Sequence, residues 1–189
     1  HTQEAVCKAV QEGFIKPVLV CSEQTKKEFA DKNSFQAFIA NSPEESARKA
    51  VEMVKNGGAD IILKGFLNTD VLLRAILDKE IGILPKDTVL THITVAKLPE
   101  YPKLLFFTDA AVIPTPTDKQ RKEQVRYIVD FCHAFEIECP KIALIHCSEK
   151  VDERHFPYTA SYKVLKEEGE KGVFGKCIID GPLDLKTSC

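Results

Sequence analysis

The sequence predicts an α/β protein whose sheets are mixed but mostly parallel, with helices on both faces, and two observations support this prediction. Segments with one apolar face at helical spacing alternate with short, continuously apolar segments, a pattern typical of parallel strands buried on both faces. Two further strand-like segments, 91–98 and 103–108, are separated by the turn Pro99-Glu-Tyr-Pro102 and predict one antiparallel hairpin.

In the first half of the chain, helix-end signals delimit the predicted elements. Ser42-Pro-Glu-Glu45 is a capping box with proline at the first helical position, and glycines are natural helix stops. The elements expected here are, in order, a helix that ends near Gly13, a strand over 17–21, a helix from Ser42 to Gly57, a strand over 59–63 and a helix from Thr69 to about Asp78.

The second half begins with the hairpin, and a Pro-rich turn over 113–117 follows it as the candidate domain hinge. Thr117 and Gln120 form a second capping box at the start of the next helix. The elements expected after this turn are a helix over 117–135, a strand over 141–148, a helix over 158–169 and a strand over 176–180.

The composition excludes several classes of partner. Lys and Arg number 26 and Asp and Glu 28, which gives a net charge of −2, and there is no long basic run. A nucleic acid or an anionic membrane would need a basic patch, so we expect neither. The longest apolar runs, such as Leu104–Phe107, are far shorter than the ~20 residues of a membrane-spanning helix.

The 7 cysteines are scattered and form no Cys-X-X-Cys pair, and the histidines are not at metal-ligand spacing, so we expect no metal site. We interpret the cysteines as reduced, mostly buried side chains of a cytoplasmic protein, since no secretory segment precedes the globular pattern. The chain begins at His1 without an initiator Met, which we interpret as a processed or an incomplete chain.

Ligands of open α/β sheets bind beyond the carboxyl ends of the strands, so residues that follow the predicted strands are the candidates. After the strand over 59–63 come Lys64 and Gly65, and the next helix begins at Thr69 and carries Arg74. A glycine turn, free helix N–H groups and two cations suit an anion such as phosphate. The alternative is a plain turn with solvated cations, because no GxxxxGK[ST] loop is present.

Two more strand ends carry polar groups. Thr108 and Asp109 are placed either to hydrogen-bond a substrate or to fix a neighbouring loop, with a simple turn as the alternative. The motif Asp180-Gly-Pro182 predicts a rigid turn that projects its carboxylate from a strand end, and turn chemistry alone explains it equally well. His92, near the start of the hairpin, is either a structural or a catalytic histidine.

Taken in order, these segments resemble the phosphate acetyl/butyryltransferase family, and the resemblance covers nearly the whole chain. The butyryltransferase branch is the more similar because of the Lys64-Gly65 and Thr91-His-Ile-Thr-Val95 blocks. The other matching blocks are Thr69 with Leu72-Leu-Arg74, Lys79-Glu80, Leu104-Leu-Phe-Phe-Thr-Asp109 with Pro114, and Ile179-Asp-Gly-Pro-Leu183.

The resemblance implies transfer of a short, butyryl-like acyl group between coenzyme A and inorganic phosphate, giving an acyl phosphate. It also implies a two-domain fold of the isocitrate/isopropylmalate-dehydrogenase type, an active site in the cleft and a homodimer. No organic cofactor or metal is implied, since coenzyme A is a substrate. We expect a first α/β domain over 1–116, with its N-terminal edge missing, and a truncated second domain over 117–189.

Residue by residue, the resemblance assigns Arg74 to phosphate or acyl phosphate, because a guanidinium binds phosphate through two parallel hydrogen bonds. The other substrate-binding candidates that match family positions are Lys64, Gly65, Thr69, His92, Thr108, Asp109, Asp180, Gly181 and Pro182.

The sequence also departs from the family pattern. It has no counterpart of the family's Gly-Asn block for the coenzyme, or of the Ser and Asp that stabilise the carbonyl and activate the thiol. We expect the Ser and Asp beyond residue 189. A non-catalytic phospho-ligand or CoA-binding module is the alternative interpretation, whereas a dehydrogenase of the same fold is disfavoured because no GxGxxG fingerprint occurs.

Overall fold

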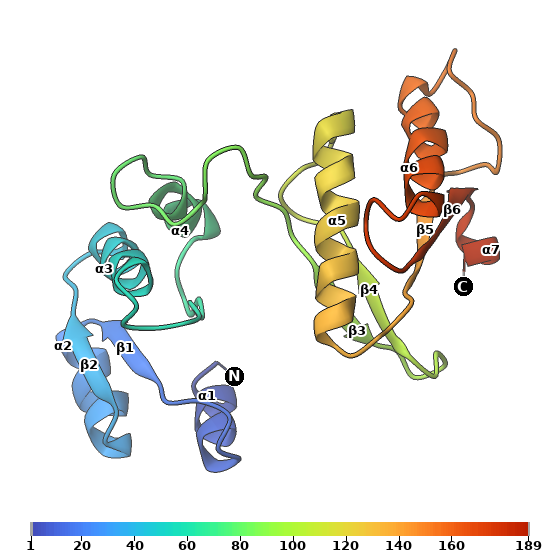
Figure 1. Ribbon diagram of the computed structural model, residues 1–189. Coiled ribbons are helices and arrows are strands. Elements are labelled where there is room, and N and C mark those ends of the chain that lie inside the picture. The colour runs from blue at the N-terminus through green and yellow to red at the C-terminus, as the bar shows by residue number, and fades with distance from the viewer. Residues whose placement is uncertain (1, 189) are drawn as a thin grey trace. The chain divides into compact units, whose positions relative to one another are not determined.

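The computed structural model describes residues 2–188, and the chain forms two compact units, His1–Lys86 and Asp87–Cys189. Both units combine helices with two-stranded sheets (Figure 1). Two of the three sheets are parallel and one is an antiparallel hairpin, so the predicted α/β class with mainly parallel pairing is confirmed. The hairpin nevertheless forms a sheet of its own, because its strands pair only with each other within the described residues.

The first unit is built around two helices beside a parallel strand pair. Its elements are α1 (Thr2–Gln11), β1 (Val18–Cys21), α2 (Glu23–Thr25), a π-helical segment (Lys26–Ala30), a 3₁₀ turn (Asp31–Asn33), β2 (Gln36–Ile39), α3 (Pro43–Lys55) and α4 (Thr69–Ile76). Helix α3 packs against both β1 and α4. The buried side chains of Ala47, Val51 and Leu72 form the core between these helices.

The start of α3 shows how local sequence sets an element boundary. The Ser42 hydroxyl accepts a hydrogen bond from the Glu45 N–H at 3.1 Å, as the capping box predicts. The Glu45 carboxylate, however, accepts from the N–H of Asn41 at 2.7 Å rather than from that of Ser42. The helix therefore begins where predicted, with a modified version of the expected cap.

In the first unit, one predicted strand is absent and one observed strand was not predicted. Residues 59–63 form no strand, and Ile61 and Leu63 are 81 % and 64 % exposed, because no neighbouring strand offers them a hydrogen-bond ladder within the described residues. Strand β2 lies between the predicted strand over 17–21 and the predicted helix from Ser42, in a segment for which we predicted no strand. An apolar run identifies a candidate strand, but it does not identify its pairing partner.

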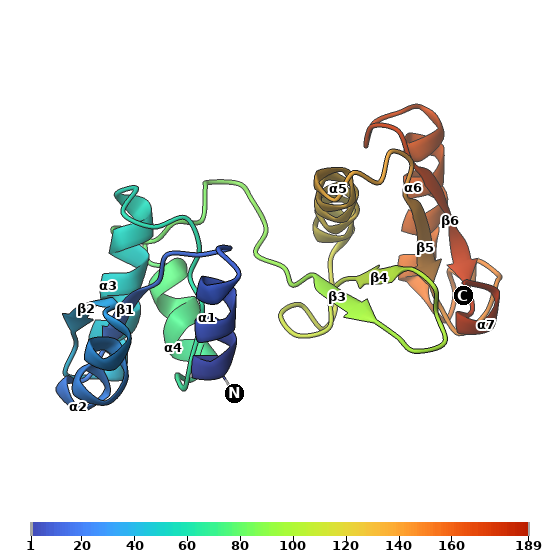
Figure 2. The ribbon, with the colours of Figure 1, turned by 90° about the horizontal axis from the view of Figure 1, so that it is seen from below.

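The second unit contains the hairpin, two long helices and a second parallel strand pair. Its elements are β3 (Thr94–Lys97), β4 (Leu104–Phe107), α5 (Asp118–Ala134), β5 (Lys141–Ile145), a 3₁₀ turn (Pro157–Thr159), α6 (Ala160–Glu170), β6 (Ile178–Leu183) and α7 (Leu185–Ser188). Figure 2 shows α5 and α6 beside the β5–β6 pair. The capping box predicted for α5 is confirmed, with reciprocal hydrogen bonds between Thr117 and Gln120.

The core of the second unit lies where both helices meet the parallel strands. Its buried members are Val125, Val129, Leu144, Tyr162, Leu165, Phe174 and Ile179. Gly169 allows α6 to approach β6 closely, because a Cβ atom there would lie 2.9 Å from the Ile179 Cδ1. None of the helices within residues 2–188 is long and apolar enough to cross a membrane.

The two compact units divide after Lys86, whereas we predicted a domain boundary between 1–116 and 117–189. Aromatic packing ties the hairpin to α5 in the second unit. The Phe106 ring contacts those of Phe131 and Phe135, with centroids 6.1 and 5.4 Å apart. The Pro-rich turn over 113–117 consequently lies inside the second unit, between β4 and α5.

Replacing Val129 by Ala removes two methyl groups from a fully buried site between α5 and the sheet. We expect Val129→Ala to lower the free energy of unfolding by about 2 kcal/mol. Val164→Ala, the same change at a 53 % exposed position of α6, should shift it by less than about 0.5 kcal/mol. Urea titration of both variants checks this, and equal losses would contradict the core assignment.

Candidate functional site

The Asp109 carboxylate, just after β4, closes a loop onto the start of the hairpin. Its Oδ1 accepts two backbone hydrogen bonds, both 2.8 Å long, and its Oδ2 accepts three hydrogen bonds of 2.7–3.2 Å. The donors are the N–H groups of Ala111 and Val112 to Oδ1, and the Thr91 hydroxyl and the N–H groups of His92 and Ile113 to Oδ2.

These hydrogen bonds keep Asp109 ionised. Partial burial of the carboxylate raises its pKa, but the donated hydrogen bonds, led by those of Val112 and Ala111, outweigh burial and lower the pKa from 3.8 to about 2. Five donors already fill the roughly four lone-pair directions of a carboxylate. The geometry therefore favours the loop-fixing role of Asp109. Direct contact of Asp109 with a substrate stays a prediction.

Thr91 lies at the centre of the cluster around Asp109. Its hydroxyl oxygen is 3.3 Å from the Thr108 Oγ1 and accepts a 3.2 Å hydrogen bond from the buried amide of Gln124 on α5. The structure thus brings together three predicted residues, Thr108, Asp109 and His92. Our sequence analysis missed Gln124, although a polar residue on the buried helical face that carries Val125 and Ile128 is a readable signal.

Lys64, which follows the apolar segment 59–63, lies beside the start of α4. The Lys64 ammonium donates hydrogen bonds to the backbone carbonyls of Leu67, at 2.8 Å, and Gly65, at 3.4 Å. Thr69 is the first residue of α4, and the side chain of the N-cap residue Asn68 makes no capping hydrogen bond. A cation next to an N-terminus without a side-chain cap is an arrangement that favours an anion.

Arg74 lies in the last turn of α4 and is mostly exposed. Its Nη2 pairs with the Asp70 Oδ2 at 2.9 Å, and the two side chains are 81 % and 60 % exposed. Within residues 2–188 no hydrogen bond or ion pair connects Arg74 with Lys64. Arg74 instead lines an open groove of about 220 Å³ between α3 and α4, together with Arg48.

The motif Asp180-Gly-Pro182 is not the turn that we predicted, because it lies inside β6. The Lys166 ammonium donates a 2.6 Å hydrogen bond to Asp180, and this contact, together with the Gly181 N–H, lowers the pKa of the carboxyl. Gly181 has φ +147°, and a Cβ atom there would lie 2.6 Å from the Leu144 Cβ. The motif thus permits close contact between β6 and β5.

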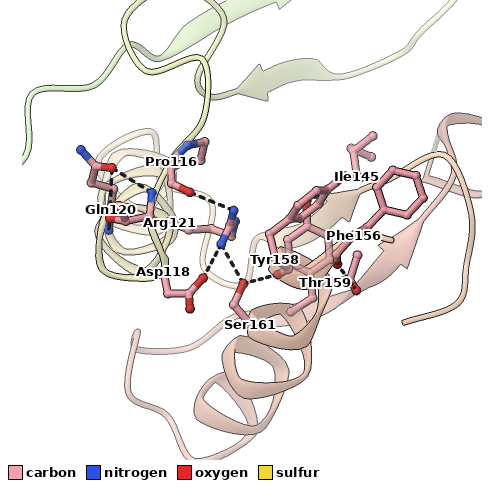
Figure 3. A network of polar contacts seen from close by, with 11 residues as sticks. Pro116, Asp118, Gln120, Arg121, Ile145, Phe156, Tyr158, Thr159 and Ser161 are labelled. Carbon is pink, nitrogen blue, oxygen red and sulfur yellow. Dashed lines mark hydrogen bonds and ion pairs between the residues drawn. The ribbon is translucent and has the colours of Figure 1, made fainter. Parts of the chain in front are cut away.

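A buried arginine network in the second unit escaped the sequence analysis (Figure 3). Arg121, on α5, is 8 % exposed, and its guanidinium lies 5.5 Å from the Tyr158 ring centroid and 5.6 Å from that of Tyr162. Its hydrogen-bond acceptors are the Asp118 carboxylate at 2.9 Å, the Ser161 hydroxyl at 2.8 Å and the Pro116 carbonyl at 3.1 Å. One side chain thus joins α5, the start of α6 and the Pro-rich turn.

His146 directly follows β5 and extends this network. Its ring is 7 % exposed, and its Nδ1 lies 3.0 Å from the Tyr158 hydroxyl. The exposed Cys147 has its Sγ 3.7 Å from the His146 Nε2. The position after a strand is the signal that could have identified His146, but its partner Tyr158 is twelve residues away and cannot be read from spacing.

The described cysteines are all free, but they are not mostly buried as we predicted. Cys132 is buried, Cys147 is exposed and the others are half-buried, because several lie at the rims of the small sheets. Cys189 lies outside the described residues. Within residues 2–188 no group of three His, Cys, Asp or Glu side chains could hold a metal ion.

Asp109→Asn should remove a pH-dependent contribution to stability. Because the folded pKa is below the unfolded value of 3.8, ionised Asp109 stabilises the fold above about pH 4, and this stabilisation disappears as the pH falls through about 2. We expect Asp109→Asn to cost on the order of 2 kcal/mol at pH 7 and progressively less between pH 4 and 2. Urea titrations at several pH values measure this difference.

Asp130→Asn is the matched control, because Asp130 is an exposed carboxylate on α5 of the same unit. Its stability should follow that of the original protein across the pH range. If the difference in unfolding free energy between Asp109→Asn and the original protein does not change with pH, the stabilising role of the ionised Asp109 carboxylate is contradicted.

Comparison with known proteins gives a consistent result. The family model described as "Phosphate acetyl/butaryl transferase" matches residues 39–187. The phosphate butyryltransferase of Clostridium acetobutylicum is 35 % identical over 96 % of this chain and 62 % of its own length. The phosphate acetyltransferase of Thermotoga maritima is 30 % identical over 98 % of this chain and 64 % of its own length.

A solved structure agrees with these relatives. The branched-chain phosphotransacylase of Enterococcus faecalis V583 has a TM-score of 0.80 and 26 % identity, over 97 % of this chain and 64 % of that one. The chain therefore spans somewhat less than two thirds of the proteins that it matches. The family match extends from β2 to α7 and includes all three candidate segments, so the chain belongs to the phosphate acetyl/butaryl transferase family.

Proposed function

We propose that this protein transfers a short acyl group between coenzyme A and inorganic phosphate. The observation that carries the proposal is the family match over residues 39–187, which includes every substrate-binding candidate from Lys64 to Pro182. The reaction joins a phosphate oxygen to the acyl carbonyl and releases the coenzyme as a thiol. Such a reaction needs two anionic substrates held in one orientation and a polarised carbonyl.

The α4 segment supports the phosphate half of this proposal. Among residues 2–188, Arg74 forms its ion pair with Asp70 at an exposed site, and exposed ion pairs contribute about 0–1 kcal/mol. A phosphate dianion that accepts two parallel hydrogen bonds from the guanidinium can therefore replace Asp70 at little cost. Lys64 and the first N–H groups of α4 would supply further positive potential to an anion at the other end of the helix.

The loop fixed by Asp109 supports the second requirement of the proposed reaction, which is that the substrates are held in one orientation. Its carboxylate holds the segment after β4 in one conformation, and a rigid loop orients a substrate at a lower entropic cost than a mobile one. The general base and the group that stabilises the oxyanion stay unassigned. We expect the family's Ser and Asp to supply them from residues that these 189 do not include.

We propose butyryl or a similar short chain as the acyl group, and coenzyme A as a substrate without any organic cofactor or metal. Support comes from the 35 % identity to one phosphate butyryltransferase, whereas a second phosphate butyryltransferase is 29 % and the phosphate acetyltransferase 30 % identical. The homodimer and the cytoplasmic location that the resemblance implies stay predictions.

The purified native polypeptide should release coenzyme A thiol from an acyl-CoA only when phosphate or arsenate is added. Acetyl-, propionyl-, butyryl- and branched-chain acyl-CoA should be compared, with a thiol reagent as the readout, and we expect the highest kcat/KM with a four-carbon chain. Release from none of these thioesters would contradict the enzyme proposal. Calorimetric binding of coenzyme A without turnover would instead support the alternative, a non-catalytic binding module.

Arg74→Ala should raise the KM for phosphate about tenfold or more, because the variant loses a bidentate phosphate ligand. Arg48→Ala is the matched control, since Arg48 lines the same groove and forms a similar exposed pair with Glu52. The phosphate kinetics of Arg48→Ala should stay close to those of the original enzyme. Equal effects in both variants would indicate general electrostatics, and unchanged kinetics of Arg74→Ala would remove it from the site.

A further inference from the structure

The loop over 110–116 is held at both ends by buried or half-buried charges. At its start, the Asp109 carboxylate accepts hydrogen bonds from the N–H groups of Ala111 and Val112. At its end, the Arg121 guanidinium donates a 3.1 Å hydrogen bond to the Pro116 carbonyl. The Asp109 anchor lies within the family-matched block, whereas nothing in our sequence analysis assigned a role to Arg121.

Arg121 is suited to hold the end of this loop rigidly. Its Nη1 donates to the Asp118 carboxylate and to the Ser161 hydroxyl, so the guanidinium is oriented by two helices before it reaches the loop. The rings of Tyr158 and Tyr162 pack against the guanidinium, as Figure 3 shows for Tyr158. A planar guanidinium can make all of these contacts at once, whereas a lysine ammonium cannot.

The loop itself presents an uncharged surface. Residues 110–116 include no ionisable side chain, and Ala110, Ala111, Pro114 and Thr115 are exposed. Val112 and Ile113 are half-buried behind them. Such a surface offers a phosphate no cation, but it offers an apolar group small side chains and a fixed shape.

We propose that Arg121 is a positioning residue that holds loop 110–116 as an apolar contact surface for the acyl chain of the thioester substrate. This inference rests on the proposed acyl transfer. Arg121 touches no reacting group and acts only through the loop. Contact between the loop and the acyl chain stabilises the bound substrate and the transition state equally. Loss of this contact therefore raises KM and leaves kcat unchanged.

Arg121→Met keeps an unbranched side chain but loses the three hydrogen bonds. We expect it to raise the KM for butyryl-CoA about fivefold or more and the KM for acetyl-CoA less, with the KM for phosphate and kcat nearly unchanged. Arg126→Met is the matched control on the same helix, because it loses a contact with the Phe174 ring and a pair with Glu123 but none with the loop. It should leave all of these constants unchanged.

Hydrogen exchange provides a readout that does not depend on activity. In Arg121→Met, peptides that cover 110–117 should exchange about tenfold faster, while β5 and β6 should keep their protection. Arg121→Lys, which keeps the charge but carries its donors on a single nitrogen, should give intermediate exchange and an intermediate KM for butyryl-CoA. If Arg121→Met does not fold, the lysine variant decides the question alone.

The outcomes separate the two proposals. An original protein that transfers no acyl group overturns the proposed function and the acyl assignment together, and the exchange of 110–117 still decides whether Arg121 positions the loop. An active protein whose Arg121→Met variant shows equal KM changes for acetyl- and butyryl-CoA overturns the acyl contact. Unchanged exchange of 110–117 overturns the positioning role.

Discussion

The half-buried carboxylate of Asp109 is the interaction on which the candidate site of the second unit depends. Its partial desolvation is a cost that five hydrogen bonds offset, and these bonds fix both the loop after β4 and the residues just before β3. Removal of the carboxylate would leave several N–H groups without their acceptor at a half-buried site. The positions of Thr91 and of the His92 backbone therefore depend on the ionised carboxylate of one side chain.

A second constraint is the close approach of backbones in the β5–β6 pair. Gly181 is tolerated at φ +147° only because it has no Cβ, and the same absence lets β6 contact Leu144 on β5. Gly169 has the corresponding role between α6 and Ile179. The contact at Gly169 sets the distance between α6 and the sheet. Ser161 and Tyr158, at and just before the start of α6, in turn contact Arg121.

The sequence predicted what depends on local periodicity and capping. The helices α3 and α5 begin at the predicted caps, Ser42 and Thr117, and the hairpin has the predicted pairing. It could not predict what depends on distant partners. Residues 59–63 have the composition of a strand but no neighbour to pair with in the described chain, whereas β2 finds one in β1 despite its polar surroundings.

The same distinction applies to the candidate site. Asp109 was found because it follows a strand, but its role depends on Thr91, eighteen residues earlier, and this pairing has no local signature. The Gly-Pro sequence of 180–182 predicts a turn, yet Asp180 and Leu183 on either side of it pair with β5, so the motif is a shift of register within a strand. The sequence does not identify Arg121, because arginines on helices are mostly exposed and the burial of this one depends on tertiary contacts.

In the candidate segments, the acidic residues and the cations differ in how they are contacted. The two acidic candidates, Asp109 and Asp180, each accept hydrogen bonds from internal donors, and the charge of Asp180 is paired with that of Lys166. Within residues 2–188, the hydrogen-bond and ion-pair partners of the cations Lys64 and Arg74 are two backbone carbonyls and one exposed carboxylate, which phosphate would replace in the proposed function. Under the proposed function, a chain of net charge −2 can therefore attract an anionic substrate, because cations at exposed positions remain available to it.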